Sequence, residues 1–105
     1  MTTTATFIAA DPRTIASQIG QWTVMSISGG RVIARPTGVT LPVSNGYSVT
    51  VDLAGDDTYT VRRILKRGAK TWVKGEEIGV YCDHLEDSAY RASCFRNVDF
   101  GAHQP

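Results

Sequence analysis

Three scarcities in this chain already exclude several classes of protein. No apolar run approaches the ~18 residues that a membrane-spanning helix needs. Only two of the 105 residues are cysteine, too few for a secreted scaffold held together by disulfides. Eleven basic and ten acidic side chains leave a net charge of +1. That balance excludes a uniformly basic nucleic-acid coat and a long acidic tail, while leaving room for a local charged patch.

The remaining composition is typical of one small folded domain. The chain is 42% hydrophobic and 20% charged, and its length allows a single core, so we expect one domain over residues 1–105 with flexible ends at 1–8 and 97–105. The first ten residues lack both the basic segment and the long apolar stretch of a secretion signal. We therefore expect a protein of the reducing cytoplasm that does not associate with membranes.

One short helix is predicted near the start of the chain. Asp11 is a favourable N-cap residue, and Pro12 suits the first helical position. Ile15 and Ile19 share one face, and Gly20 can end the helix. Because two helical turns are not stable alone, this apolar face must pack against the rest of the protein.

The chain that follows is punctuated like a series of strands. Gly29-Gly30 predicts a tight hairpin turn between strands at 22–28 and 31–35. Pro36 and Pro42 make the next stretch a candidate edge strand. Beyond Glu76-Glu77, we expect two further short strands, at 78–82 and 89–95, separated by a turn that begins at Asp83.

Alternation of apolar and polar residues allows the strand register to be predicted. A three-residue loop at 44–46 pairs Leu41 with Val49, with Gly46 in the left-handed position. The next connections pair Val51 with Val61 and Leu65 with Trp72. The predicted core face therefore consists of Tyr47, Val49, Val51, Leu53, Tyr59, Val61, Leu65 and Trp72. The expected fold is α+β and mostly β: a curved antiparallel sheet or small barrel of about six strands with one short N-terminal helix.

Several blocks of the sequence together resemble a family. They are ISGGRV at 27–32, LPV at 41–43 with Gly46-Tyr47 after it, DTYTVRR at 57–63, KGE at 74–76, VYCD at 80–83 and AYRASCF at 89–95. These blocks resemble small uncharacterised proteins encoded by actinobacteriophages, mycobacteriophages especially, over residues 15–95. The resemblance implies a phage accessory protein that acts in the cytoplasm of the host cell. It implies no activity and no catalytic residues.

The distribution of charge is the strongest functional signal. Residues 58–75 contain six basic side chains and no acidic one: Arg62, Arg63, Lys66, Arg67, Lys70 and Lys74. With Tyr59 and Trp72 nearby, this basic hairpin is the predicted site for nucleic acid or a nucleotide. The register places Arg62 and Lys66 on the outer face and the other four on the core side. Alternatively, these cations only neutralise the segment 76–99, which contains six acidic side chains and two arginines.

Cysteine and histidine raise the question of a metal site. Cys82, His84 and Cys94 would need Asp83 or His103 as a fourth ligand, whereas structural zinc normally has two well-spaced ligand pairs. Both cysteines adjoin aromatic residues in predicted strands, which favours buried free thiols over a disulfide. We expect neither a metal nor a cofactor.

No arrangement of residues indicates catalysis. The glycines at 29–30 match neither a phosphate-binding loop nor a nucleophile elbow, and His84 lies among carboxylates without a nucleophile. Trp22 and Trp72 are expected in the core.

The leading hypothesis is therefore a non-enzymatic protein that binds nucleic acid or a nucleotide through the basic hairpin. The alternative is an inhibitor or adaptor that binds a host or phage protein through an exposed strand edge at 31–43. An enzyme of unrecognised type comes third.

Overall fold

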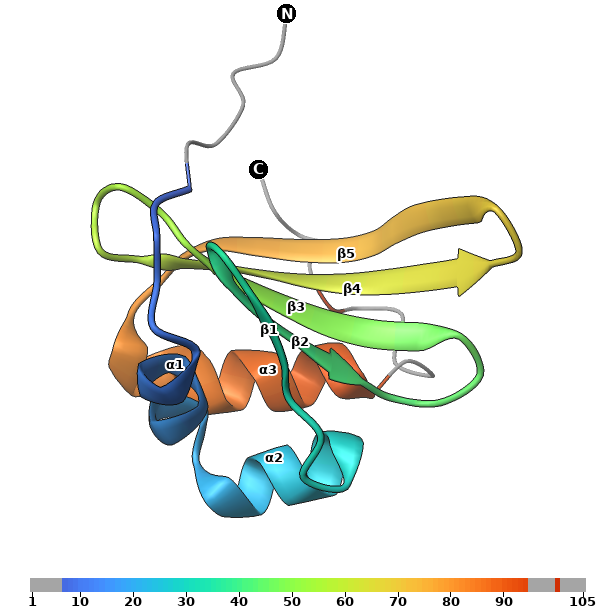
Figure 1. Ribbon diagram of the computed structural model, residues 1–105, viewed down its shortest axis with the longest axis horizontal. Coiled ribbons are helices and arrows are strands. Elements are labelled where there is room, and N and C mark those ends of the chain that lie inside the picture. Colours follow the sequence, from blue (N-terminus) through green and yellow to red (C-terminus); the bar gives the residue numbers. More distant parts are fainter. Residues whose placement is uncertain (1–6, 95–99, 101–105) are drawn as a thin grey trace, which may run out of the picture.

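A five-stranded antiparallel sheet carries helices on one face (Figure 1). The computed structural model describes residues 7–94 and Phe100. Within them the order of elements is α1 (Pro12–Ile19), α2 (Gln21–Ser28), β1 (Ile33–Arg35), β2 (Gly38–Pro42), β3 (Tyr47–Leu53), β4 (Tyr59–Arg67), β5 (Lys70–Val80), the 3₁₀ turn η1 (Cys82–His84) and α3 (Leu85–Ser93). The strands lie in sequence order. The α+β, mostly β class is confirmed, but the sheet stays open rather than closing into a barrel, and α-helices form three of the elements.

Helix α1 is built as its sequence predicts. The carboxylate of Asp11 accepts a hydrogen bond from the backbone N–H of Arg13 at 2.9 Å, and Pro12 is the first helical residue. Ile15 and Ile19 are both buried. The cap and the proline define where the helix begins, and the two isoleucines anchor it to the sheet.

Residues 22–28, predicted as a strand, form helix α2 instead. Val24 and Ile27, three positions apart, face inward and are buried. Gly29 adopts a left-handed φ of 66°, and its N–H bonds the carbonyl of Met25 at 2.9 Å, so it caps a helix rather than turning a hairpin. Trp22, predicted in the core, is 83% exposed because the helix turns it outward.

The predicted register of the central strands is confirmed. Leu41 lies opposite Val49, Val51 opposite Val61 and Leu65 opposite Trp72. Gly46 has a φ of 84°, as the three-residue loop requires. The prediction of an edge strand is wrong. β2, which ends at Pro42, lies between β3 and the short strand β1, and β1 forms the edge of the sheet.

Strand β5 continues past Glu76 instead of breaking there. The pairing of β4 with β5 shifts register twice, once between Arg63 and Ile64 and once between Tyr59 and Val61. Such bulges absorb an extra residue without ending the strand. Lys74 is the extra residue in the first bulge, since Val73 and Gly75 pair with consecutive residues of β4. Residues 78–80 of the strand predicted at 78–82 are therefore the end of β5, and Tyr81 and Cys82 lie beyond it.

The strand predicted at 89–95 is also wrong, as far as the described residues reach. Leu85, Ala89 and Ala92 are buried at helical spacing on α3, which runs to Ser93. Four- and three-residue steps between apolar positions are typical of one helix face, whereas a strand would bury alternate residues.

The core lies between the sheet and the helices. Ile15, Ile19 and Leu85 pack from the helical side. Of the predicted core face, Val49, Val51, Tyr59 and Val61 are buried, and Tyr47, Leu53 and Leu65 are half-buried. Trp72 is 43% exposed, contrary to prediction, because the β4–β5 hairpin extends beyond the helical layer (Figure 1).

Both ends of the described chain pack on the sheet. Ile8 donates a backbone hydrogen bond to Leu53 at 2.9 Å. Phe100 is buried against β5, where a Cβ on Gly75 would lie 2.6 Å from its carbonyl oxygen. The flexible ends predicted from the sequence otherwise lie outside the described residues, at 1–6, 97–99 and 101–105.

Candidate functional site

The fold separates the six predicted basic residues into three environments. Arg63 points to the helical side of the sheet and is 2% exposed. Its guanidinium donates hydrogen bonds to the carbonyls of Ala92 at 2.8 Å and of Arg91 and Cys94 at 3.0 Å each. A cation here donates hydrogen bonds to carbonyls that have no partner within α3, and it interacts favourably with the negative end of the helix dipole. Arg63 therefore holds α3 on the sheet and is too deeply buried to contact a ligand on the surface.

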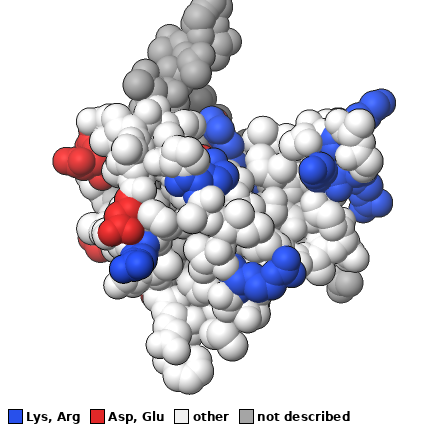
Figure 2. All heavy atoms as spheres, in the orientation of Figure 1, with Lys and Arg blue, Asp and Glu red and all other residues white. Residues whose placement is uncertain are grey.

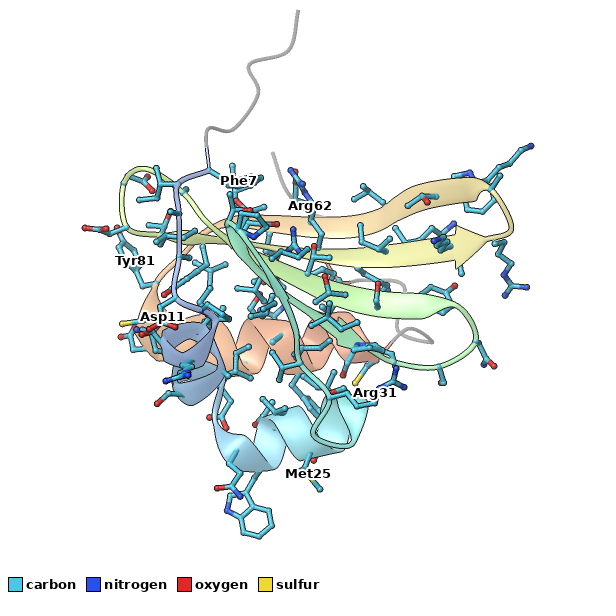
Figure 3. All side chains as sticks on the ribbon, in the orientation of Figure 1. Phe7, Asp11, Met25, Arg31, Arg62 and Tyr81 are labelled. Carbon is cyan, nitrogen blue, oxygen red and sulfur yellow. The ribbon has the colours of Figure 1, made fainter. Side chains whose placement is uncertain are left out.

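Arg62, on the opposite face, is also occupied by contacts within the protein. Its Nε donates to the carboxylate of Glu76, directly across the strands, at 2.5 Å. The guanidinium also lies over the ring of Phe7, 5.3 Å from its centroid, and Figure 3 shows both residues on the outer side of the sheet. For Arg62, these contacts fit the alternative hypothesis that the cation neutralises a carboxylate of the acidic segment.

The other four cations form what we call the basic tip: Lys66, Arg67, Lys70 and Lys74, all exposed on the outer half of the β4–β5 hairpin. Arg67 lies directly opposite Lys70. Within the described residues, none of the four is within ion-pair distance of a carboxylate. Figure 2 shows blue atoms without red ones at this end of the molecule.

An exposed aromatic residue accompanies the basic tip. Trp72 lies on β5 opposite Leu65, with 43% of its surface accessible. Its neighbour Val73 is also exposed, on the other face of the hairpin. The tip thus combines cations with a flat apolar surface on a projecting element.

Two carboxylates of the acidic segment after the tip are paired with a different arginine, Arg91. Arg91 bonds both carboxylate oxygens of Glu77, at 2.6 and 2.8 Å, and one of Asp87 at 2.8 Å. Burial alone raises the pKa of Glu77, but hydrogen bonds from Arg91 and Ser88 outweigh it, so this pKa lies below its ordinary value. These carboxylates therefore do not serve as partners for the basic tip.

A shallow hollow of about 650 Å³ lies beside the basic tip. Lys66 lines one part of it and Arg31 another. Arg31 lies 35 positions before Lys66 and outside the basic segment, so it was not among the residues predicted to bind nucleic acid. Only the order of the strands places both residues on the same hollow, so no pattern along the sequence could have predicted that they share it.

The cysteines are free, and Cys82 is exposed, contrary to the predicted buried thiol. The reason is that β5 ends at Val80, so Cys82 begins the surface turn η1. Cys94 is half-buried. Within residues 7–94 and Phe100, no three His, Cys, Asp or Glu side chains gather as metal ligands, and His103 lies outside this part of the chain.

No helix in the described part of the chain is both long and apolar enough to cross a bilayer. Comparison of the chain with known protein families, curated proteins and solved structures finds no match.

Proposed function

We propose that this protein is a non-enzymatic binding protein that holds single-stranded nucleic acid on its basic tip. The observation that carries the proposal is the cross-strand pair of Arg67 and Lys70, two like charges placed opposite each other with no carboxylate beside them in the described structure. Like charges in this position destabilise a hairpin by a few tenths of a kcal/mol, up to about 1 kcal/mol. A row of phosphates relieves that repulsion and gains favourable contacts with both cations.

The aromatic residue favours a single strand over a duplex. Bases in a duplex already stack on each other, whereas an unpaired base can stack on an exposed ring. Trp72 offers such a ring beside the cations. Stacking of this kind contributes about 1–3 kcal/mol per base with little dependence on sequence.

A free nucleotide fits the same surface less well. Nucleotide pockets are concave and enclose most of their ligand. The basic tip is the projecting end of the β4–β5 hairpin (Figure 1), and its cations spread over the two strands. An extended polyanion contacts such a surface at several points, whereas a single nucleotide contacts it at one.

From the resemblance to actinobacteriophage proteins, we further propose that this binding takes place in the cytoplasm of an infected cell. Non-enzymatic action remains part of the proposal.

Binding of a host or phage protein is the second candidate. The observation that favours it is the surface of α2, which has no charged residue and exposes Trp22 and Met25. The strand edge predicted for this role is short, since β1 has only three residues. An uncharged surface helix with an exposed tryptophan is a better candidate contact than that edge.

The test compares two changes of charge at different sites. Arg67→Gln combined with Lys70→Gln removes two cations from the basic tip. Arg13→Gln removes one exposed cation from α1 and serves as the control. Binding to labelled oligothymidylate and oligouridylate is measured by fluorescence polarisation, at several salt concentrations from about 50 mM upwards.

The expected result follows from counterion release. A slope of about 0.7 per phosphate contact makes each contact worth about eightfold at 50 mM salt relative to a 1 M reference. The double variant should therefore bind about 60-fold more weakly at 50 mM, with a salt slope smaller by about 1.4. Arg13→Gln should bind within about twofold of the unmutated protein. Unchanged binding by the double variant, or an equal loss in the control, contradicts the proposal.

The stability of the double variant gives a second and independent readout. Because Arg67 and Lys70 repel each other, their removal should raise the free energy of unfolding slightly while it weakens binding. A purely structural role predicts the opposite change in stability.

A further inference from the structure

We propose that the bound strand continues from the basic tip into the hollow beside it, where Arg31 receives a second phosphate. This inference rests on the proposed function and adds a path for the ligand. We call this feature the outer hollow, and its polar lining consists of Lys66, Arg31, Thr40, Ser44, Tyr47 and Ser48.

The chemistry of the outer hollow fits a phosphate backbone. Its lining includes two cations and four residues that carry a hydroxyl group, and none of its lining residues is acidic. The hydroxyl of Thr40 accepts from Arg35 at 2.8 Å, so its own proton remains available to donate. Ser44 and Ser48 use their hydroxyls in no hydrogen bond within the described residues. Arginine, lysine and hydroxyl side chains are the usual donors to phosphate oxygens.

The backbone of Arg31 is held in place by the end of α2. The N–H of Arg31 bonds the carbonyl of Ser28 at 3.3 Å, and the hydroxyl of Ser28 donates to the carbonyl of Arg31 at 2.6 Å. Figure 3 shows Arg31 at the connection between α2 and β1. Its guanidinium is exposed and makes no ion pair within the described residues. The cation is therefore anchored through its backbone and open to a ligand.

The two cations of the outer hollow are too widely placed for a single phosphate. Lys66 belongs to β4 and Arg31 lies two residues before β1, with β3 and β2 between these strands. Three spacings between neighbouring strands amount to about 14 Å. Figure 2 shows blue atoms at the hairpin end and again lower on the same face, with no red atoms between them. A strand that contacts both cations therefore crosses the sheet and presents separate phosphates to them.

This path predicts a dependence on the length of the ligand. The shortest oligonucleotides reach only the basic tip, and longer ones also reach Arg31. The experiment measures affinity for oligothymidylates and oligouridylates from two to twelve nucleotides, with the unmutated protein, Arg31→Gln, the tip double variant and Arg13→Gln.

Arg31→Gln should leave dinucleotide binding unchanged and weaken binding of the longest oligonucleotides about eightfold at 50 mM salt, with a salt slope smaller by about 0.7. The tip variant should lose affinity at every length, and Arg13→Gln at none. Equal binding of all lengths by Arg31→Gln and the unmutated protein overturns the path through the outer hollow. A loss that is the same at every length overturns it too, since this indicates only a change in overall charge.

Failure of the proposed function gives a different result. In that case the unmutated protein binds no oligonucleotide of any length, and both proposals fall. If the unmutated protein and the tip variant behave as expected and Arg31→Gln does not, only the path through the outer hollow is wrong. Circular dichroism of each variant confirms that the fold is intact.

Discussion

Replacing Arg63 by methionine tests whether a cation from the basic segment holds the helical layer on the sheet. Methionine has a similar length but donates no hydrogen bond and carries no charge. The change leaves three carbonyls at the end of α3, those of Arg91, Ala92 and Cys94, without their guanidinium donor. It also removes the contact with the ring of Phe100, 5.2 Å from the guanidinium carbon.

The magnitude follows from these contacts. Hydrogen bonds from a charged group contribute about 1.5–3 kcal/mol each, so three at the low end amount to about 4.5 kcal/mol. Burial lowers the pKa of Arg63, which shows that desolvation of the charge opposes part of this gain. We expect a net loss of about 3 kcal/mol in the free energy of unfolding. For a domain of this size, that lowers the melting temperature by roughly 12–24 °C.

The matched control is Arg67→Met. It is the same substitution four residues later on the same strand, at an exposed position of the basic tip. Its free energy of unfolding should stay within about 0.5 kcal/mol of the unmutated protein. The assay is urea denaturation followed by far-ultraviolet circular dichroism, with equal slopes required for the comparison.

The reasoning is refuted if Arg63→Met costs less than about 1 kcal/mol, or if both variants lose the same amount. Should Arg63→Met not fold, Arg63→Lys keeps the charge and loses part of the donor geometry, and an intermediate loss is expected.

Two further predictions concern the loop at Gly46 and the pairing of Glu77. Gly46→Val should lower the free energy of unfolding by about 1–2 kcal/mol or more, because φ is 84° there and a Cβ would lie 2.6 Å from the carbonyl of Lys66. Gly68→Val, at a positive φ but in open space, should cost less in the same urea titration, and equal losses would contradict the close approach. Because the pKa of Glu77 is lowered in the folded state, the unfolded chain binds the proton first. Its contribution is therefore present above the unfolded pKa near 4.5 and lost as pH falls through the lower folded pKa. Glu77→Gln should flatten the fall in stability below pH 4.5, and an unchanged slope would show that the carboxylate is not stabilised as described.

The central strands were predictable because their periodicity is strict and their turns are short. Alternation over β3 and one glycine at 46 determine which residues face each other, since a slip of one residue would reverse both faces. Helix α1 was predictable from its cap and its proline. In each case a local rule and the tertiary packing agree.

The two missed helices lack such signals. Helix α2 has no side-chain cap, and its residues fit a strand as well as a helix over eight positions. In α3, Leu85, Ala89 and Ala92 have helical spacing, but the aromatic residues beside them favoured a strand. The long strand β5 was missed because bulges at Lys74 and near Gly79 break its alternation.

The candidate site was predictable only in part. Position in the strand separates Arg63 from Arg62, since alternate residues of β4 face opposite sides, and the expected core-side position of Arg63 matches its burial. Its hydrogen bonds to the end of α3 could not be predicted, because the sequence of that helix favoured a strand. The outer hollow depends on residues from four separate segments, and no spacing along the chain encodes it.

The most direct test of single-strand binding at the basic tip is a fluorescence titration of Trp72. In Trp22→Phe protein, Trp72 is the remaining tryptophan, so its emission reports on the tip alone. Oligothymidylate added at about 50 mM salt should quench this emission to a saturable limit, and added salt should reverse the quenching. If the emission does not change, and the unmutated protein also binds no single strand, duplex, RNA or cyclic nucleotide at low salt, the basic tip is not a nucleic-acid site. A protein partner on α2 then becomes the leading explanation.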